Sequence, residues 1–338
     1  MNTHPPPSSR LLPSLLLVLA SGLMLTACGK KTAPTEAQQA YVVTVPAAAT
    51  PATENAPDAA AAVKTEDEKD QERERQREIE REREREREVP MMRAVFGKDY
   101  RAESEDALAD LTDPENHREK LSYVVSAVGH KILPDGRVIL LANAETANTE
   151  GTAESAHVSQ GLLNVFFLSP KGKPGDGQWQ VTKRLENVAA FGSFGQLGEI
   201  IWVTPGAGKI GLAVRHGYTG QGYTIEQLAL FELGQDSISE LNGSIDLHSD
   251  NMGACGPETE ECWQVNGAWR FVPAKDGGPY DDLVVSFSGA TEKLKTGAAV
   301  KPDEDPPRTS TPIKGHARYA FDGKVYKLVE GKNIVPGV

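Results

Sequence analysis

A short stretch rich in glycine and tyrosine carries the residue types best suited to binding another molecule. Its glycines allow a backbone to approach a ligand closely, and its tyrosine rings present flat faces with a polar edge. Residues 215–223 therefore predict a loop that contacts a carbohydrate or the edge of a protein, and the alternative is an ordinary β-hairpin loop. The side chains expected to make contact are Arg215, His216, Tyr218, Gln221 and Tyr223.

The sequence holds little that is arranged for catalysis. Neither the G-x-S-x-G nucleophile elbow nor the H-E-x-x-H zinc motif occurs in it, and the histidines stand singly. Residues 206–211 match the G-x-G-x-x-G pattern of dinucleotide-binding loops, but a strand-like run rather than a helix follows, which predicts a hairpin turn. We expect a protein that is not an enzyme. The alternative is a cell-envelope hydrolase whose catalytic residues the sequence does not identify.

Cys28 ends a segment with the features of an export signal. Arg10 precedes an apolar run over residues 11–25, and small residues follow it. Leu25-Thr26-Ala27-Cys28 resembles the lipobox of bacterial lipoproteins, which implies cleavage before Cys28 and acylation of its sulfur and its new amine. Gly29 rather than Asp comes next, which favours the outer membrane. We therefore expect residues 1–27 to be a signal peptide and the protein to be lipid-anchored on the periplasmic face of the outer membrane.

Cys255 and Cys262 remain as a pair if Cys28 is lipidated. Export to an oxidising compartment then predicts a disulfide between them. So short a loop stabilises by about 2 to 3 kcal/mol in the chain-entropy picture. The alternative is a metal site that adds His248, but the sequence offers neither a C-x-x-C pair nor a fourth ligand at a familiar spacing.

Two polar segments separate the lipidation site from the folded part. Residues 28–65 are rich in Ala, Pro and Thr and predict a disordered linker. Residues 66–89 end in an alternation of Glu with Arg and predict a solvated single helix, because they are strong helix formers with no breaker until Pro90. Opposite charges three residues apart, as in Glu78 and Arg81, are partly offset by like charges four residues apart. Ile79 is the one apolar residue between positions 66 and 88, so no coiled-coil seam forms. The two segments hold the folded part away from the membrane.

The remaining residues predict an all-β domain after a transitional segment. Residues 90–117 form the transition, with one short helix over residues 105–111 that ends before Pro114. Apolar runs bounded by turn residues then recur over residues 118–338, which predicts an antiparallel meander, either propeller-like or a β-sandwich. The expected strands cover residues 121–128, 137–143, 161–169, 178–184, 199–204, 210–216, 224–233, 244–247 and 283–287.

Two Gly-containing pairs predict tight hairpins near the end of the chain. Asn266-Gly267 is expected to join two short strands. Asp322-Gly323 is expected to form a type I′ turn in which Tyr319 opposes Tyr326, so that one buried face carries Tyr319, Phe321, Tyr326 and Leu328.

An acidic stretch resembles part of a known repeat. Residues 276–285 resemble the acidic loop and following strand of FG-GAP-like β-propeller repeats, and this resemblance implies a propeller-like meander. In that family spaced acidic side chains hold calcium, and the positions here are Asp276, Asp281 and Asp282. The upstream positions are Val272 and Ala274, however, so we expect no bound calcium and no other cofactor. Bacterial lipoproteins of that sort include inhibitors of cell-wall-degrading toxins.

Charge balance narrows the range of partners. Lys and Arg number 36 against 48 Asp and Glu, a net charge of −12, which excludes a general affinity for nucleic acid or anionic lipid headgroups. We expect contact with the membrane through the lipid alone, and a protein or glycan partner in the periplasm. The expected function is that of a binding module, in its most concrete form an immunity or inhibitor protein against an envelope-targeting toxin. A structural envelope component based on the charged helix is a further alternative.

Overall fold

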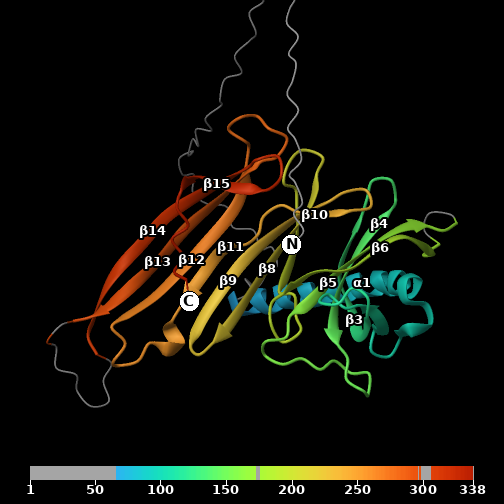
Figure 1. The fold of residues 1–338 in the computed structure, drawn as a ribbon, viewed down its shortest axis with the longest axis horizontal. Coiled ribbons are helices and arrows are strands. Elements are labelled where there is room, and N and C mark those ends of the chain that lie inside the picture. Colours follow the sequence, from blue (N-terminus) through green and yellow to red (C-terminus); the bar gives the residue numbers. More distant parts are fainter. Residues whose placement is uncertain (1–65, 173–175, 296, 298–305, 338) are drawn as a thin grey trace, which may run out of the picture. The chain divides into compact units, whose positions relative to one another are not determined.

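The computed structural model describes residues 66–172, 176–295, 297 and 306–337, and the predicted signal peptide, Cys28 and the linker lie outside these residues. Within them, one long helix precedes fifteen strands that form two antiparallel sheets (Figure 1). The strands follow one another in chain order within each sheet, except that one short strand of the second sheet lies off the main path. This confirms the predicted all-β class, the meander and the charged helix that precedes it.

Helix α1, Glu66–Phe96, has an exposed part and a docked part. Residues 70–87, here called the charged rod, are almost entirely exposed, whereas the last two turns bury four apolar side chains against the first sheet: Met91, Met92, Val95 and Phe96. The sequence predicted that this helix ends before Pro90, but the helix continues through Pro90 to Phe96. Proline removes one helical hydrogen bond, and the burial of this apolar group offsets that cost.

The first sheet consists of six strands in the order β1 to β6. The short helix predicted over residues 105–111 is wrong, because this segment is β2. Ala107, Ala109 and Leu111 alternate onto one buried face beneath α1, and β2 pairs with β3, so tertiary burial overrides the helical spacing. The strands are β1 (Tyr100–Arg101), β2 (Asp106–Thr112), β3 (Lys120–Ile132), β4 (Val138–Thr146), β5 (Gly161–Pro170) and β6 (Trp179–Phe191).

The second sheet holds nine strands, with β10 attached at β9 and with β15 and β7 at the ends of the main path. Short helical turns η1 (Gly97–Asp99) and η2 (Met252–Ala254) lie in the connections. The strands are β7 (Glu199–Val203), β8 (Ile210–Gly220), β9 (Tyr223–Leu233), β10 (Ile238–Glu240), β11 (Ile245–Asp250), β12 (Glu261–Val272), β13 (Asp282–Leu294), β14 (Arg308–Phe321) and β15 (Tyr326–Gly331).

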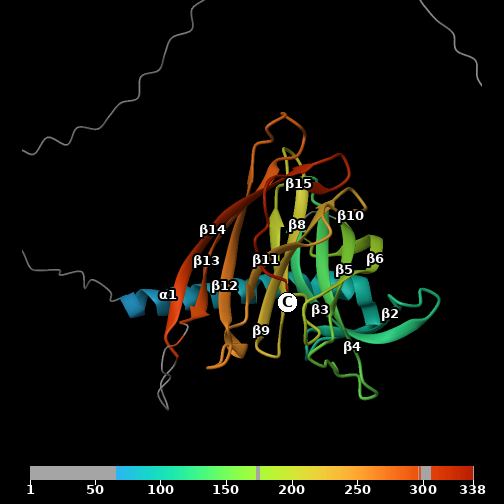
Figure 2. The same cartoon turned by 60° about the vertical axis from the view of Figure 1, so that its left-hand side comes forward.

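Strand β4 shows how the layers are stacked. Every residue from Val138 to Ala144 is buried, because its two faces contact different neighbours. Leu140 packs in the cluster beneath α1, whereas Ile139 and Leu141 pack with β8 and β9 of the second sheet. The first sheet thus lies between α1, which runs across its strands (Figure 2), and the second sheet. Stacked sheets of six and nine strands agree with the sandwich alternative, not with the four-stranded blades of a propeller.

The hairpin predicted at Asn266-Gly267 is wrong. Both residues lie in the middle of β12, where Gly267 pairs with Phe287 of β13. A Cβ atom at Gly267 would lie 2.9 Å from the carbonyl oxygen of Leu247. The glycine therefore permits close approach within a central strand rather than a turn.

The last hairpin turns where the sequence predicted, but its register differs. Phe321 pairs with Tyr326, and Tyr319 pairs with Leu328. The loop spans residues 322–325, because the Asp322 carboxylate accepts hydrogen bonds from the backbone N–H groups of Lys324 (2.9 Å) and Val325 (2.8 Å). Tyr319 and Tyr326 are buried as expected, whereas Leu328 is 47% exposed.

Candidate functional site

The predicted binding stretch, residues 215–223, forms the end of β8, a tight turn and the start of β9. Gln221 and Gly222 form the turn with φ of +53° and +84°, and Gly220 pairs with Tyr223. Positive φ at both turn residues is the geometry of a type I′ hairpin. The stretch is therefore a regular hairpin, and its tip is fixed by a hydrogen bond from the Ala254 N–H of η2 to the Gly222 carbonyl (3.1 Å).

Alternation along β8 sends the predicted residues to opposite faces. His216 and Tyr218 share the face of Leu212 and Val214, which packs toward the first sheet, and Arg215 lies on the other face. The ring of Tyr218 lies over Gly220, where any Cβ atom would collide with it. The absence of a side chain at Gly220 thus determines where Tyr218 lies.

Three rings from three separate segments form an exposed aromatic stack: Tyr218, His157 and Phe194. The imidazole of His157, from the β4–β5 connection, lies 4.7 Å from the Tyr218 ring and 4.8 Å from the Phe194 ring. Phe194 belongs to the β6–β7 connection and is 56% exposed, and Tyr218 is 39% exposed. Val158, beside His157, is 74% exposed. An exposed apolar group of this kind is typical of an interaction site.

Hydrogen bonds hold the loops that carry His157 and Phe194, and the one donated by Asn143 is buried. The Asn143 side-chain amide of β4 donates to the Gly195 carbonyl (2.7 Å), and the Gln196 amide donates to the Glu145 carboxylate (2.8 Å). The Gly195 N–H donates to the Ser159 carbonyl (2.8 Å), which joins the two loops. The aromatic stack is therefore positioned before any partner arrives.

Phe194 adopts an unusual backbone conformation at this point. Its φ is +52°, in the left-handed region that costs a non-glycine residue about 1 kcal/mol or more. Residues strained in this way are enriched at functional sites. Phe194 is both strained and exposed. The fold itself therefore gives less reason for an aromatic side chain here than at the other two positions of the stack.

His216 lies beside the stack, closer to the core. Its ring is 4.6 Å from that of Phe191, which in turn packs edge-on against Phe231. Burial lowers the pKa of the His216 imidazole below its ordinary value. Its Nε2 atom is buried without a hydrogen-bond partner among the described residues. The imidazole is therefore held neutral near pH 7.

Two hollows along β8 collect all five predicted residues. One, of about 560 Å³, is lined by Tyr218, Gly220, Gln221, Tyr223 and Ile225. The other, of about 280 Å³, includes Arg215 and His216 together with Glu199 and Glu226. Arg215 forms ion pairs with Glu199 (3.1 Å) and Glu226 (3.9 Å) across neighbouring strands. The surface is thus aromatic in one half and charged in the other.

Sequence reasoning did not identify His157, Phe194 or Val158. Residues 145–160 form a polar loop of the kind that often carries binding surfaces, but no spacing singles out His157 within it. Phe194 has only the pattern Gly-Ser-Phe-Gly around it, which signals a turn. Their approach to Tyr218 depends on the packing of the two sheets.

Cys255 and Cys262 form the predicted disulfide, with their Cα atoms 5.7 Å apart. The loop they close follows η2, and Arg308 of β14 donates to the carbonyls of Gly256 and Thr259 within it (both 2.8 Å). His248 takes no part, since its ring nitrogens contact Asn266 (2.9 Å) and Asp250 (2.8 Å). The disulfide therefore supports the turn on which the β8–β9 tip rests.

Two of the three acidic residues considered for calcium, Asp276 and Asp282, make other side-chain contacts, and Asp281 is held through its backbone, whose carbonyl accepts from the Tyr326 hydroxyl (2.8 Å). Asp282 is buried and forms an ion pair with Arg318, whose Nη2 and Nε lie 2.5 and 2.6 Å from one carboxylate oxygen. The Asp276 carboxylate accepts from the Gly278 N–H (2.9 Å). In the part of the chain that the structure describes, no three His, Cys, Asp or Glu side chains are grouped to hold a metal ion.

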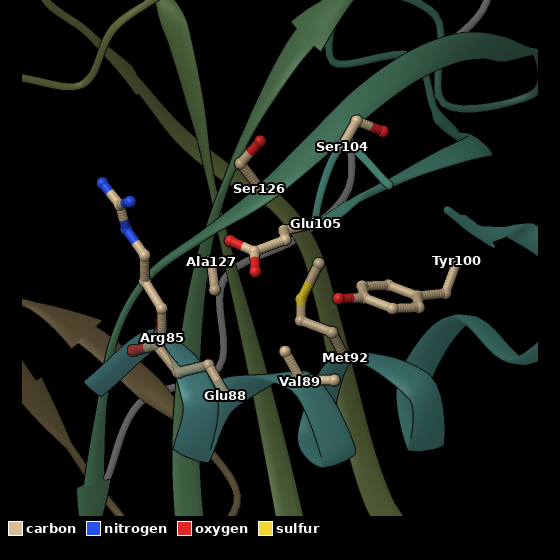
Figure 3. Close-up of a pocket in the computed structure, with 9 residues that line it drawn as sticks. All are labelled: Arg85, Glu88, Val89, Met92, Tyr100, Ser104, Glu105, Ser126 and Ala127. Carbon is tan, nitrogen blue, oxygen red and sulfur yellow. The ribbon is translucent and has the colours of Figure 1, made fainter. Parts of the chain in front are cut away.

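A separate polar cavity of about 350 Å³ lies where α1 meets the first sheet. Figure 3 shows the Tyr100 hydroxyl and the Glu105 carboxylate pointing into it. Burial and the nearby Glu105 carboxylate raise the pKa of Tyr100, against the opposing effect of Arg93. On one wall, Glu88 of α1 contacts the Nδ1 atom of His130 (3.1 Å), and both side chains are almost fully buried. This contact fixes the helix to β3 at the base of the charged rod.

Comparison with known proteins finds no matching protein family, no similar curated protein and no similar solved structure. Among the helices that the structure describes, none combines the length and the apolar character needed to cross a bilayer.

Proposed function

We propose that this protein is an outer-membrane lipoprotein, anchored through Cys28, whose β domain binds a protein partner in the periplasm. The anchor is supported by the export signal and the lipobox-like residues at positions 25–28. Binding is supported by the aromatic stack. An exposed cluster of Tyr218, His157 and Phe194, held in place by hydrogen bonds, is the single observation that carries the proposal.

The chemistry of the surface favours a protein over a glycan. Protein interfaces place aromatic anchors at the centre and charged groups at the rim. Phe194 and Val158 have no polar atom on their side chains to offer a sugar hydroxyl, and both are largely exposed. The hollow around Arg215, which also includes Ser193 next to Phe194 in the chain, offers groups of both signs of charge.

An immunity or inhibitor role is the most concrete form of this function. Inhibitory interfaces are preorganised, because rigid loops lose little entropy on binding. The charged rod adds reach, since a helix rises 1.5 Å per residue and separates the domain from the lipid anchor. The partner is then an envelope-targeting toxin, encoded next to the gene for this chain.

The experiment replaces Phe194 with a photo-crosslinking phenylalanine analogue in living cells. We expect one discrete crosslinked protein, which is identified as the neighbouring toxin, and we expect deletion of the gene to sensitise cells to that toxin. The matched control carries the analogue at Leu328, an exposed apolar position on β15, and yields no such product. A toxin that neither crosslinks nor gains potency on deletion, or turnover of peptidoglycan by the purified protein, contradicts the proposal.

A further inference from the structure

A second hollow, far from the aromatic stack in sequence, has a different chemistry. It measures about 470 Å³ and lies between α1, the ends of β3 and β5 and the start of β6. We propose that it binds one molecule of a long-chain carboxylate, with the alkyl chain in the hollow and the carboxylate at Arg87. Its lining includes Arg87, Met91, Ile132, Asp135, Pro170 and Trp179.

The walls of this hollow are mostly apolar. Met91 is buried at the back, and Trp179 packs partly buried against the same cluster beneath α1. Pro170 pairs with Trp179 across β5 and β6, which continues the apolar wall. Ile132 at the end of β3 is 58% exposed. A large side chain left in water at the edge of an apolar hollow is stabilised when a ligand covers it.

The charge at the mouth selects the head group. Asp135 is already paired, because its carboxylate accepts hydrogen bonds from the Arg137 side chain (2.8 Å) and backbone (3.1 Å). Arg87, at the end of the charged rod, is exposed and forms no ion pair with another described residue. The uncompensated charge at the mouth is therefore positive, and it is complementary to a carboxylate.

The size of the hollow limits the occupant to a single chain. A volume of about 470 Å³ falls in the range of about 300 to 1,000 Å³ that is typical of small-molecule sites. A free monoacyl carboxylate is the occupant that matches the apolar walls, the charge and the volume together.

The test uses the chain from residue 28 onward with Cys28→Ser, which needs no detergent, and a dansyl-labelled undecanoate. Excitation of tryptophan should give sensitised dansyl emission when the probe binds, and unlabelled palmitate should suppress it by competition. Ile132→Asp should weaken binding at least tenfold, because it places a charge against the bound chain. Leu328→Asp, at another exposed apolar residue, should bind as the parent protein does.

The head-group contact is tested separately. Arg87→Gln should weaken undecanoate binding about threefold and reduce its salt dependence, whereas the matched undecanol probe should bind both proteins equally. Arg77→Gln on the exposed part of α1 is the charge control. Circular dichroism verifies that each variant is folded. Equal binding by folded Ile132→Asp and the parent, or displacement of the probe by phosphatidylglycerol vesicles, overturns the proposal.

Discussion

The imidazole of His216 lies 4.6 Å from the phenyl ring of Phe191, and the next residue on that face of β8, Tyr218, joins the exposed aromatic stack. A titratable ring thus separates the apolar core from the proposed binding surface. Protonation of this ring would place a charge among aromatic side chains, without a hydrogen-bond partner for Nε2 among the described residues.

This arrangement predicts acid sensitivity. Burial lowers the pKa of His216 in the folded protein below the ordinary value of 6.5, so the unfolded chain binds a proton more readily. The contribution to stability is complete above pH 6.5 and is lost as the pH falls through the folded-state pKa. We expect His216→Phe to flatten the decline of Tm between pH 7.5 and 5. The exposed control His117→Gln should decline as the parent does.

Substitutions of Phe194 are expected to affect stability and partner binding differently. Phe194→Gly removes the ring but relieves the φ of +52°, so it should be about 1 kcal/mol more stable than Phe194→Ala. Both variants should lose the co-purified partner. Denaturant unfolding measures the first effect. A Gly variant that is less stable than the Ala variant would show that the left-handed conformation carries no strain.

The buried ion pair between Asp282 and Arg318 joins β13 to β14, and we expect it to contribute strongly to the stability of the second sheet. Asp282→Ala leaves a guanidinium without its partner in a buried site and should cost about 3 to 5 kcal/mol. The double variant Asp282→Leu with Arg318→Met should recover part of this loss. Glu330→Ala breaks an exposed pair with Lys275 and should lower the stability far less than Asp282→Ala does.

Removal of the disulfide should have a modest effect on unfolding. Cys255→Ser with Cys262→Ser is expected to lower the free energy of unfolding by about 2.5 kcal/mol, because the closed loop is short. Reducing agent should destabilise the parent protein by a similar amount and leave the double variant unchanged. A loss near the whole stability of the domain would show that the disulfide holds more than the η2 turn.

The sequence predicted most strands because apolar runs and turn residues act locally. The runs around β4, β5 and β9 all became strands with nearly the expected bounds. The errors arose where tertiary packing overrode the local pattern. Burial beneath α1 converted the helical spacing at residues 105–111 into β2, and the neighbours of β12 kept Asn266-Gly267 extended.

The candidate site was predicted in part for the same reason. Residues 215–223 have a composition that is visible in the sequence, and the structure places Arg215 and Tyr218 on two adjoining hollows. His157 reaches Tyr218 from a connection 61 residues away in the chain, and Phe194 contacts His157 from a third segment. Such contacts depend on how the sheets stack, which composition does not encode.

The charged rod has one further consequence. Several arginines are exposed along residues 70–87. All the apolar side chains of α1 that pack against the first sheet come after Glu88. A trypsin-like protease that cuts the rod would therefore detach the whole β domain with its fold intact. With the proposed lipid anchor at Cys28, a single cleavage would leave a short stub on the membrane and release the β domain as a freely diffusing protein.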